Sequence, residues 1–262
     1  MRRAVAGLVP STTIPVELNA ASFAAGARSS VTLVVALGDL ASLAGGRGSV
    51  PLDVVAGAFD RSGQPKASAR QKLRLSVPAT GQTGQRRIEV LSRLDLLPGD
   101  YEIRVGVTAG EPAKSASVFS YLTVPAFQAE PLAMSNVIIR AVPPTATAPG
   151  DFLSKVVPVV PTAQRAFSST DRLIGYLRLY QGTSRTDPLL PVELRTSVID
   201  AEGKAVASAS DLLAATQFSN GRTADHYITL PLATLSQGEY LLRLEARMGE
   251  RAAGRAVRFS VK

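Results

Sequence analysis

The residue best suited to acid–base chemistry in this sequence is His226, its only histidine. A serine hydrolase triad places a histidine between a serine and an acid. Asp225 directly precedes His226, but neighbouring side chains of an extended strand point to opposite faces, so this pair does not make a triad. The nucleophile-elbow pattern Gly-x-Ser-x-Gly is also absent from the sequence. We therefore expect His226 to be a surface or turn histidine.

The sequence also lacks the residue patterns of metal and cofactor sites. The sequence has no cysteine, which excludes disulfides, thiolate catalysis and zinc sites built on cysteine. It has no Asp-x-Asp-x-Asp-Gly calcium loop. The glycine-rich stretch Gly45–Gly48 lacks the lysine and the following helix of a phosphate-binding loop. The sequence thus predicts no catalytic, metal or cofactor site, and a protein that is not an enzyme.

The charge and hydropathy patterns limit the partners. The net charge is +8, but the basic residues are dispersed, and Arg2-Arg3 and Arg86-Arg87 are the only adjacent pairs. Dispersed single charges are typical of solvated strand faces, so we expect no nucleic-acid binding. No stretch approaches the ~20 apolar residues of a membrane-spanning helix. About six apolar residues separate Arg3 from Pro10, fewer than a signal peptide requires, so no clear signal peptide is predicted.

The elements that would position any site follow a period of two. Lys72–Val77 and Tyr101–Val107 alternate apolar and polar residues, and turn signals such as Asp60–Gly63 separate short apolar runs. This pattern predicts an all-β sandwich. Asp39–Leu43 and Ser210–Ala215 are the two places where the sequence favours about one helical turn.

The second half of the chain repeats the first. Leu96–Val105 aligns with Leu235–Leu244, and an offset of 139 residues relates Tyr101 to Tyr240. The turn residues Asp60–Gly63 recur 140 residues later. We infer two tandem immunoglobulin or fibronectin-III-like Greek-key sandwiches related by duplication. The predicted domains are 10–126 and 131–262, joined near Pro125–Pro131, with a long proline-rich loop at 143–164 in the second.

One repeated motif predicts a structural role. Leu-x-Pro-Gly-x-Tyr, with Gln237 in place of the proline in the second copy, precedes an alternating strand. This is typical of a tyrosine corner, in which the ring packs in the core and its hydroxyl bonds a backbone group a few residues upstream. The predicted corners consist of Gly99 with Tyr101 and Gly238 with Tyr240. Glycine permits the bend that precedes each tyrosine. Because the tyrosine recurs in the same slot, we interpret it as architecture and not as a ligand contact.

The chain resembles the C-terminal β-sandwich region of bacterial von Willebrand factor A-related (VWFA-related) proteins. The stretches that carry the resemblance are Leu94–Val105, Leu122–Phe127, Arg172–Tyr180 and Arg255–Val261. In such proteins an export signal and a metal-binding von Willebrand A domain lie upstream. The Asp-x-Ser-x-Ser motif of that domain is absent from this sequence. The resemblance therefore implies an envelope or secreted context and supplies no site residue.

Together these patterns predict a non-enzymatic structural or interaction module, acting as a spacer or a protein-docking tandem in an exported or envelope bacterial protein. The expected location is periplasmic, cell-surface or secreted where the domains belong to a longer exported chain. The expected partner is a protein, either an upstream domain of the same chain or an envelope component. Two alternatives stay open, which are a polysaccharide-binding module and a two-domain periplasmic chaperone that binds by strand addition.

Overall fold

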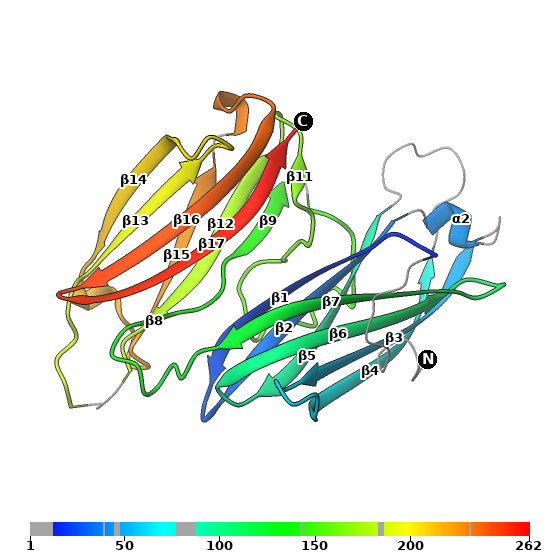
Figure 1. Cartoon of the computed structure of the whole chain (residues 1–262), viewed down its shortest axis with the longest axis horizontal. Helices are drawn as coiled ribbons and strands as arrows, with labels where there is room; N and C mark the ends of the chain where they lie inside the picture. The colour runs from blue at the N-terminus through cyan, green and yellow to red at the C-terminus, as the bar shows by residue number, and fades with distance from the viewer. Residues whose placement is uncertain are drawn as a thin grey trace. The chain divides into compact units, whose positions relative to one another are not determined.

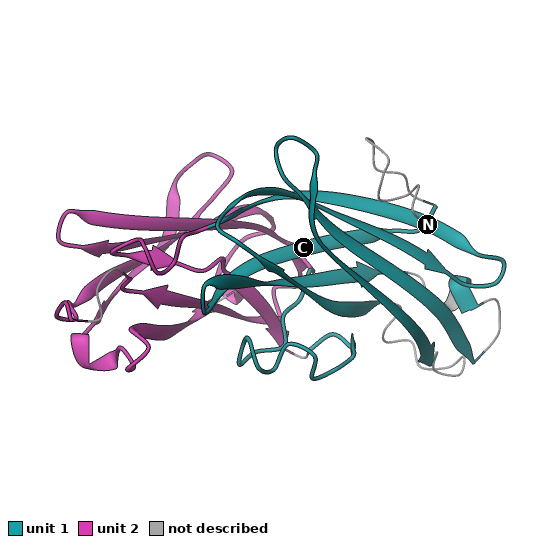
Figure 2. Ribbon diagram, turned by 90° about the horizontal axis from the view of Figure 1, so that it is seen from below, with its two compact units in different colours: residues 1–124, 144–163 teal, residues 125–143, 164–262 magenta. Residues whose placement is uncertain are grey.

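The computed structural model describes residues 13–38, 40–44, 48–76, 87–142, 144–182, 186–230 and 232–262. Strands make up 62% of it and helix 4%, and none of its sheets closes into a barrel. The chain therefore has the all-β sandwich fold that the sequence predicted. It divides into two compact units, coloured teal and magenta in Figure 2. Arg2, Arg3, Arg86, Pro143 and the residues 45–47 lie outside the described ranges.

Unit 1 comprises the residues up to Val124 together with 144–163. It forms two four-stranded sheets, with strand orders β1-β2-β5-β10 and β4-β3-β6-β7 (Figure 1). Its elements are β1 (Val16–Ala25), β2 (Arg28–Leu37), α2 (Leu40–Ala44), β3 (Ser49–Phe59), β4 (Pro65–Ser76), β5 (Ile88–Leu96), β6 (Gly99–Ala109), β7 (Lys114–Val124) and β10 (Thr147–Ala148).

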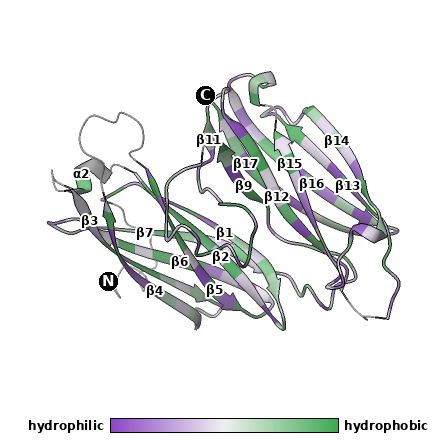
Figure 3. Ribbon diagram, turned by 180° about the vertical axis from the view of Figure 1, so that it is seen from behind, coloured by the Kyte–Doolittle hydropathy of each residue, from purple (hydrophilic) through white to green (hydrophobic). Residues whose placement is uncertain are grey.

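The core of unit 1 lies between these two sheets. Val31, Leu33 and Val35 of β2 share one hydrophobic cluster with Ile103 and Val105 of β6. Alternate residues supply these side chains because successive strand residues point to opposite faces. Figure 3 shows hydrophobic and hydrophilic bands alternating along the strands. Burial of the alternate apolar residues thus explains why the period-two segments of the sequence form strands.

The segment 144–163 departs from the sequence-based expectation of a loop in the second domain, because it groups with unit 1. Its strand β10 pairs in parallel with β5, and Thr147 lies opposite Glu89. The Glu89 carboxylate is 0% exposed and accepts hydrogen bonds from the Thr162 hydroxyl at 2.6 Å and the Ala163 N–H at 2.8 Å. This segment, named the arm below, is fixed to unit 1 by contacts distant in sequence.

Unit 2 comprises 125–143 and 164–262. One of its sheets has the order β11-β17-β16-β13-β14, and in the other β12 pairs with β15 on one side and with β8 and β9 on the other. Its elements are β8 (Ala133–Met134), β9 (Ile138–Val142), β11 (Ala166–Phe167), β12 (Arg172–Tyr180), β13 (Val192–Ile199), β14 (Ala205–Leu213), η1 (Ala215–Gln217), β15 (Thr223–Leu230), η2 (Leu232–Thr234), β16 (Gly238–Met248) and β17 (Arg251–Val261).

Of the two helical turns predicted from the sequence, the first lies in a helix and the second lies mostly in a strand. Of the first, Asp39–Leu43, the residues from Leu40 onward belong to the short helix α2, and Asp39 lies outside the described ranges. The second prediction, Ser210–Ala215, is wrong for most of its length, since β14 continues to Leu213 and pairs with β13. Leucine and alanine favour helix locally, but pairing with a neighbouring strand overrides so weak a preference.

The two units repeat one strand plan. In unit 1, β3 lies between β4 and β6, and in unit 2, β13 lies between β14 and β16. The hairpin turns match as well. The Gly63 N–H donates to the Asp60 carbonyl at 2.9 Å, and the Gly203 N–H donates to the Asp200 carbonyl at 3.1 Å. Both glycines have positive φ, of 78° and 83°, a backbone region that glycine enters without strain.

Candidate functional site

The predicted corner tyrosines occupy equivalent places in the two units. The Tyr101 hydroxyl donates to the Leu97 carbonyl at 3.0 Å, and the Tyr240 hydroxyl donates to the Ser236 carbonyl at 2.8 Å. Both side chains are buried in the cores of their units. Each bond spans four residues at the bend before a strand, which is the arrangement of a tyrosine corner.

The two corner glycines differ in backbone conformation. Gly99 has a φ of 150°, and a Cβ built on it would lie 3.5 Å from the Tyr101 hydroxyl. At Gly238 the corresponding distance to the Tyr240 hydroxyl is 3.9 Å, without a positive φ. Gly99 is therefore the position where the backbone itself favours glycine.

The candidate binding surface lies on the other face of the same unit-1 strands. Tyr101 points into the core, so the flanking residues of β6 point outward, and cross-strand register adds residues from β3 and β7 to the same face. Phe59 and Tyr121 are both paired with Glu102, and Phe119 is paired with Arg104. We name this set the aromatic–arginine face: Phe59, Glu102, Arg104, Phe119 and Tyr121.

Arg104 is held at the centre of this face. Its guanidinium carbon lies 4.4 Å from the centroid of the Phe59 ring and 5.3 Å from that of Phe119. Its Nε donates to Glu102 Oε1 at 2.5 Å. These cation–π and charge-assisted contacts fix an otherwise flexible side chain. Tyr121, by contrast, is 83% exposed and presents a large ring to solvent.

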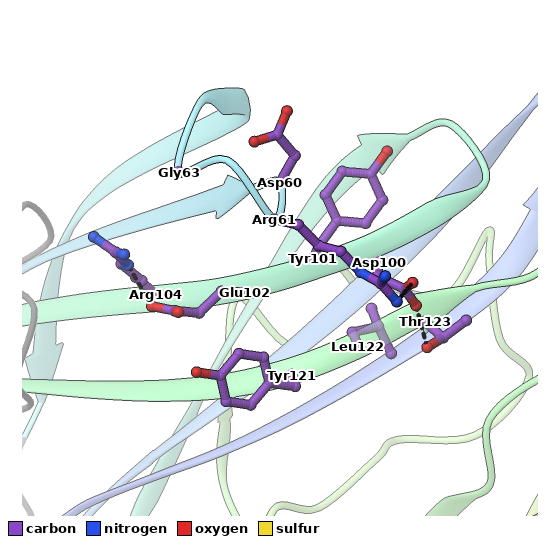
Figure 4. Close-up of a pocket in the computed structure, with 10 residues that line it drawn as sticks. All are labelled: Asp60, Arg61, Gly63, Asp100, Tyr101, Glu102, Arg104, Tyr121, Leu122 and Thr123. Carbon is purple, nitrogen blue, oxygen red and sulfur yellow. Dashed lines mark hydrogen bonds and ion pairs between the residues drawn. The ribbon is translucent and has the colours of Figure 1, made fainter.

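A shallow depression of about 570 Å³ adjoins the face and is drawn in Figure 4. It is lined by residues from the β3–β4 turn, β6 and β7. Arg61 contacts Asp100 at 2.5 Å, and the Thr123 hydroxyl donates to Asp100 at 2.6 Å. The bond from Thr123, more than the contact with Arg61, lowers the pKa of Asp100 below its usual value. The Lys66 ammonium, together with Ser62 and the Gln64 N–H, holds the pKa of Asp60 well below its usual range.

The carboxylates of Asp60 and Asp100 are therefore ionised at neutral pH, and each already accepts hydrogen bonds from neighbouring side chains of the protein. A general acid needs a raised pKa, and a general base needs a free lone pair directed at the substrate. The depression offers a polar surface beside an exposed ring, which suits binding better than proton transfer.

Unit 2 provides an internal comparison for this surface. Strand register places Ile199, Ala256 and Arg258 where unit 1 has Phe59, Phe119 and Tyr121. The tyrosine corner thus occurs in both units, but the three aromatic rings of the outer face occur only in unit 1. The face is consequently a feature of unit 1 and not a requirement of the shared fold.

His226 does not lie in a turn or on the open surface, contrary to the prediction. It lies in β15, and its side chain is 16% exposed. Burial lowers its pKa, against the opposing effect of Asp211, whose carboxylate oxygen is 3.6 Å from Nε2. Asp225 instead accepts bonds from Tyr176 and Arg178, so the two neighbours point to different environments, as expected for a strand.

Within the described ranges, no group of three or more His, Asp or Glu side chains is placed to hold a metal ion. Among the same residues, none of the helices has the length and apolar character needed to cross a bilayer.

The aromatic–arginine face is not among the sites predicted from the sequence. A partial signal existed, since Phe119 and Tyr121 alternate on one strand, as do Glu102 and Arg104 on the next. Recognising one surface required the pairing register of three strands, which local periodicity does not supply.

No family model matches the sequence, and a comparison with curated proteins gives no match. Among solved structures, the chain is similar to a glycosyl hydrolase family 2 member from Bacteroides cellulosilyticus, with 11% identity, 88% of this chain and 28% of that chain covered, and a TM-score of 0.33. The C-terminal domain of the AgI/II polypeptide BspA from Streptococcus agalactiae gives 9% identity, coverages of 89% and 93%, and a TM-score of 0.30.

PorU from Porphyromonas gingivalis gives 15% identity, coverages of 99% and 21%, and a TM-score of 0.30. The chain spans 32% and 26% of the length of two other matched hydrolases. All three structures described come from bacterial proteins. At these scores the likeness assigns neither a family nor an activity to this chain.

Proposed function

We propose that this chain is a non-enzymatic interaction module, a tandem of immunoglobulin or fibronectin-III-like sandwiches that docks to a partner protein through the aromatic–arginine face. The observation that carries the proposal is the arrangement of Arg104, clamped between two rings and Glu102 beside the exposed Tyr121. Tyrosine, phenylalanine and arginine are enriched in protein interfaces, and tyrosine and arginine are, with tryptophan, enriched among hot spots.

The clamped arginine supports docking for an energetic reason. An arginine that is mobile in the free protein loses rotamer freedom when a partner orders it, at about 0.5–1.5 kcal/mol. Arg104 is already ordered by Phe59, Phe119 and Glu102, and its side chain is only 11% exposed, so this cost is largely absent and its main effect is to hold the surrounding face in place. Tyr121 adds a rigid ring with two rotatable torsions. A preorganised, partly apolar face of this kind favours a protein surface as its ligand.

The immunoglobulin or fibronectin-III assignment rests on two features. The strand order of the two sheets is repeated in both units, and each unit has a tyrosine corner. The exported or envelope location rests on the resemblance to VWFA-related proteins. A fractionation blot of the source cells tests that location. We expect the protein in the envelope or the medium, and a signal confined to the soluble cytoplasm would contradict it.

A polysaccharide-binding role is the second candidate, because an exposed tyrosine ring beside a polar depression is also able to stack on a sugar. Electrophoresis in gels that contain cell-envelope polysaccharides distinguishes this role from protein docking. The protein-docking proposal predicts unchanged mobility for the wild-type chain. Retardation that disappears in Tyr121→Ala would favour the glycan role instead.

The docking proposal is tested with a matched pair of variants. Tyr121→Ala removes the exposed ring, and Arg258→Ala truncates the residue at the corresponding register position of unit 2. Tagged chains are purified from the source cells and their bound proteins are quantified. We expect one bound protein to fall at least about tenfold with Tyr121→Ala and to persist with Arg258→Ala. Equal binding by all three chains would contradict the proposal.

A further inference from the structure

The strand β14 ends one sheet of unit 2 and leaves its outer edge unpaired by any described strand. An edge strand presents free backbone N–H and C=O groups, which makes it a template for pairing with another strand. Seven of its nine residues are exposed, and among them Val206 is 43% and Leu212 71% exposed. Asp211 is the only charged residue between Ala205 and Leu213. The edge is thus long, apolar and nearly uncharged.

The corresponding edge strand of unit 1 is β4. It occupies the same place in its sheet, and the pairing Ala58–Ala67 corresponds to the pairing Val198–Ala207 at an offset of 140 residues. At that offset Pro65, Lys66, Arg70 and Lys72 of β4 correspond to Ala205, Val206, Ser210 and Leu212 of β14.

The difference between the two edges has a clear physical meaning. Proline and lysine are the residues with which natural proteins block edge-to-edge pairing, because one lacks an N–H and the other resists burial. Unit 1 carries these blocking residues at its edge. Unit 2 has small or apolar residues at every one of the corresponding positions.

We propose that β14 is a self-association edge, which pairs antiparallel with β14 of a second copy of this chain about a two-fold axis at Ala209. This is the register in which all nine residues overlap. A two-fold axis perpendicular to the sheet keeps the outward-facing residues of both copies on one side. Leu212 then lies opposite Val206 of the second copy, and the reverse pair forms by symmetry.

The charges favour this register as well. Asp211 lies opposite Ala207 of the second copy, so no two like charges face each other directly across the new ladder. The apolar cross-strand pairs bring together the two exposed apolar side chains of the strand. The contact is a single strand pair and is small beside the ~1,200–2,000 Å² of stable interfaces, so we expect micromolar or weaker dissociation constants.

The first test is analytical ultracentrifugation of the full chain over a wide range of concentration. We expect the wild type to show a monomer–dimer equilibrium. Val206→Lys with Leu212→Lys restores the lysines of β4 and should abolish the dimer. The control is Leu97→Lys with Leu190→Lys, which adds the same charge at two other exposed leucines and should leave the dimer intact. Circular dichroism of each variant verifies folding.

A second test reads the register directly and uses the absence of cysteine in the chain. Paired residues of antiparallel strands have Cα atoms about 4.5–5.5 Å apart, within the range that a disulfide bridges. Ala209→Cys lies on the two-fold axis and should form a dimer under mild oxidation. Leu212→Cys is the control, since its own copies would lie about 20 Å apart.

A wild-type dimer that is lost with the restored lysines, kept in the leucine control and trapped through position 209 but not 212 supports the inference. A chain that stays monomeric at every concentration overturns it. A dimer that survives the restored lysines, or that crosslinks equally at both positions, shows association through another surface and also overturns it. The inference does not depend on the aromatic–arginine face.

Discussion

The arm, residues 144–163, depends on one buried carboxylate, and Glu89→Ala tests that dependence. Glu89 accepts from the Thr162 hydroxyl and the Ala163 N–H, and all three residues are buried. A hydrogen bond to a charged group contributes about 1.5–3 kcal/mol, and its loss leaves the donors buried without this acceptor. Two such bonds contribute about 3–6 kcal/mol. Removal of the carboxylate also ends its own desolvation cost, which offsets part of that loss, so we expect a net loss of about 3–5 kcal/mol in the free energy of unfolding of unit 1.

Two further variants calibrate this value. Glu89→Gln keeps an oxygen acceptor without the charge and should cost less, about 1–2 kcal/mol. Glu17→Ala removes a carboxylate that is 54% exposed and accepts two bonds of 3.0 Å from Arg87, whose Nη2 also lies 3.6 Å from Glu89 Oε1. An exposed ion pair contributes at most about 1 kcal/mol, so this variant should be nearly neutral.

The assay combines urea denaturation with amide hydrogen exchange. Exchange reports local opening, so it distinguishes detachment of the arm from loosening of the whole unit. We expect Glu89→Ala to accelerate exchange across 144–163 while β3 and β6 keep their protection. The reasoning is refuted if Glu89→Ala costs no more than Glu17→Ala, or if exchange rises evenly over unit 1.

Three other predictions follow from single contacts. Tyr101→Phe and Tyr240→Phe should each destabilise their own unit by about 1–3 kcal/mol, because the upstream carbonyl loses its donor, and unchanged unfolding curves would contradict this. Because burial lowers the pKa of His226 in the folded chain, the unfolded chain binds the proton more readily, and unit 2 should lose stability as the pH falls through about 6.5. In thermal unfolding, His226→Gln should lack this pH-dependent loss of stability. Arg104→Met should weaken partner binding at least about tenfold while circular dichroism stays unchanged, and wild-type binding by this variant would argue against the clamp.

The fold could be predicted from sequence because its determinants are local and repeated. The alternating residues of Tyr101–Val107 became β6, and the turn at Asp60–Gly63 has the same hydrogen bond as its counterpart at Asp200–Gly203. Period two and turn chemistry require no knowledge of distant residues.

The placement of the arm and the strand β14 could not be predicted from local sequence patterns. Residues 144–163 contain many prolines and little alternation, so their local pattern indicates a loop, whereas contacts with Glu89 determine where they lie. Ser210–Ala215 favours a helical turn by composition, yet its pairing with β13 makes it mostly strand. In both cases a long-range contact overrides a weak local preference.

The candidate site could not be predicted from the sequence because it, too, depends on contacts between residues distant in the chain. Each of its residues, read alone, is an ordinary outward position of a strand. Phe59, Glu102 and Tyr121 become neighbours only through the register of β3, β6 and β7. The corner residues Gly99, Tyr101, Gly238 and Tyr240 were accessible from sequence because each corner is a single short motif.

Contact between unit 1 and a partner protein through the aromatic–arginine face is open to a direct test by site-specific photo-crosslinking in the source cells. A benzophenone amino acid replaces Tyr121 in one chain and Arg258, its register counterpart in unit 2, in another. We predict a light-dependent adduct with one protein from position 121 and none with that protein from position 258. No adduct from position 121, or the same adduct from both positions, would contradict it.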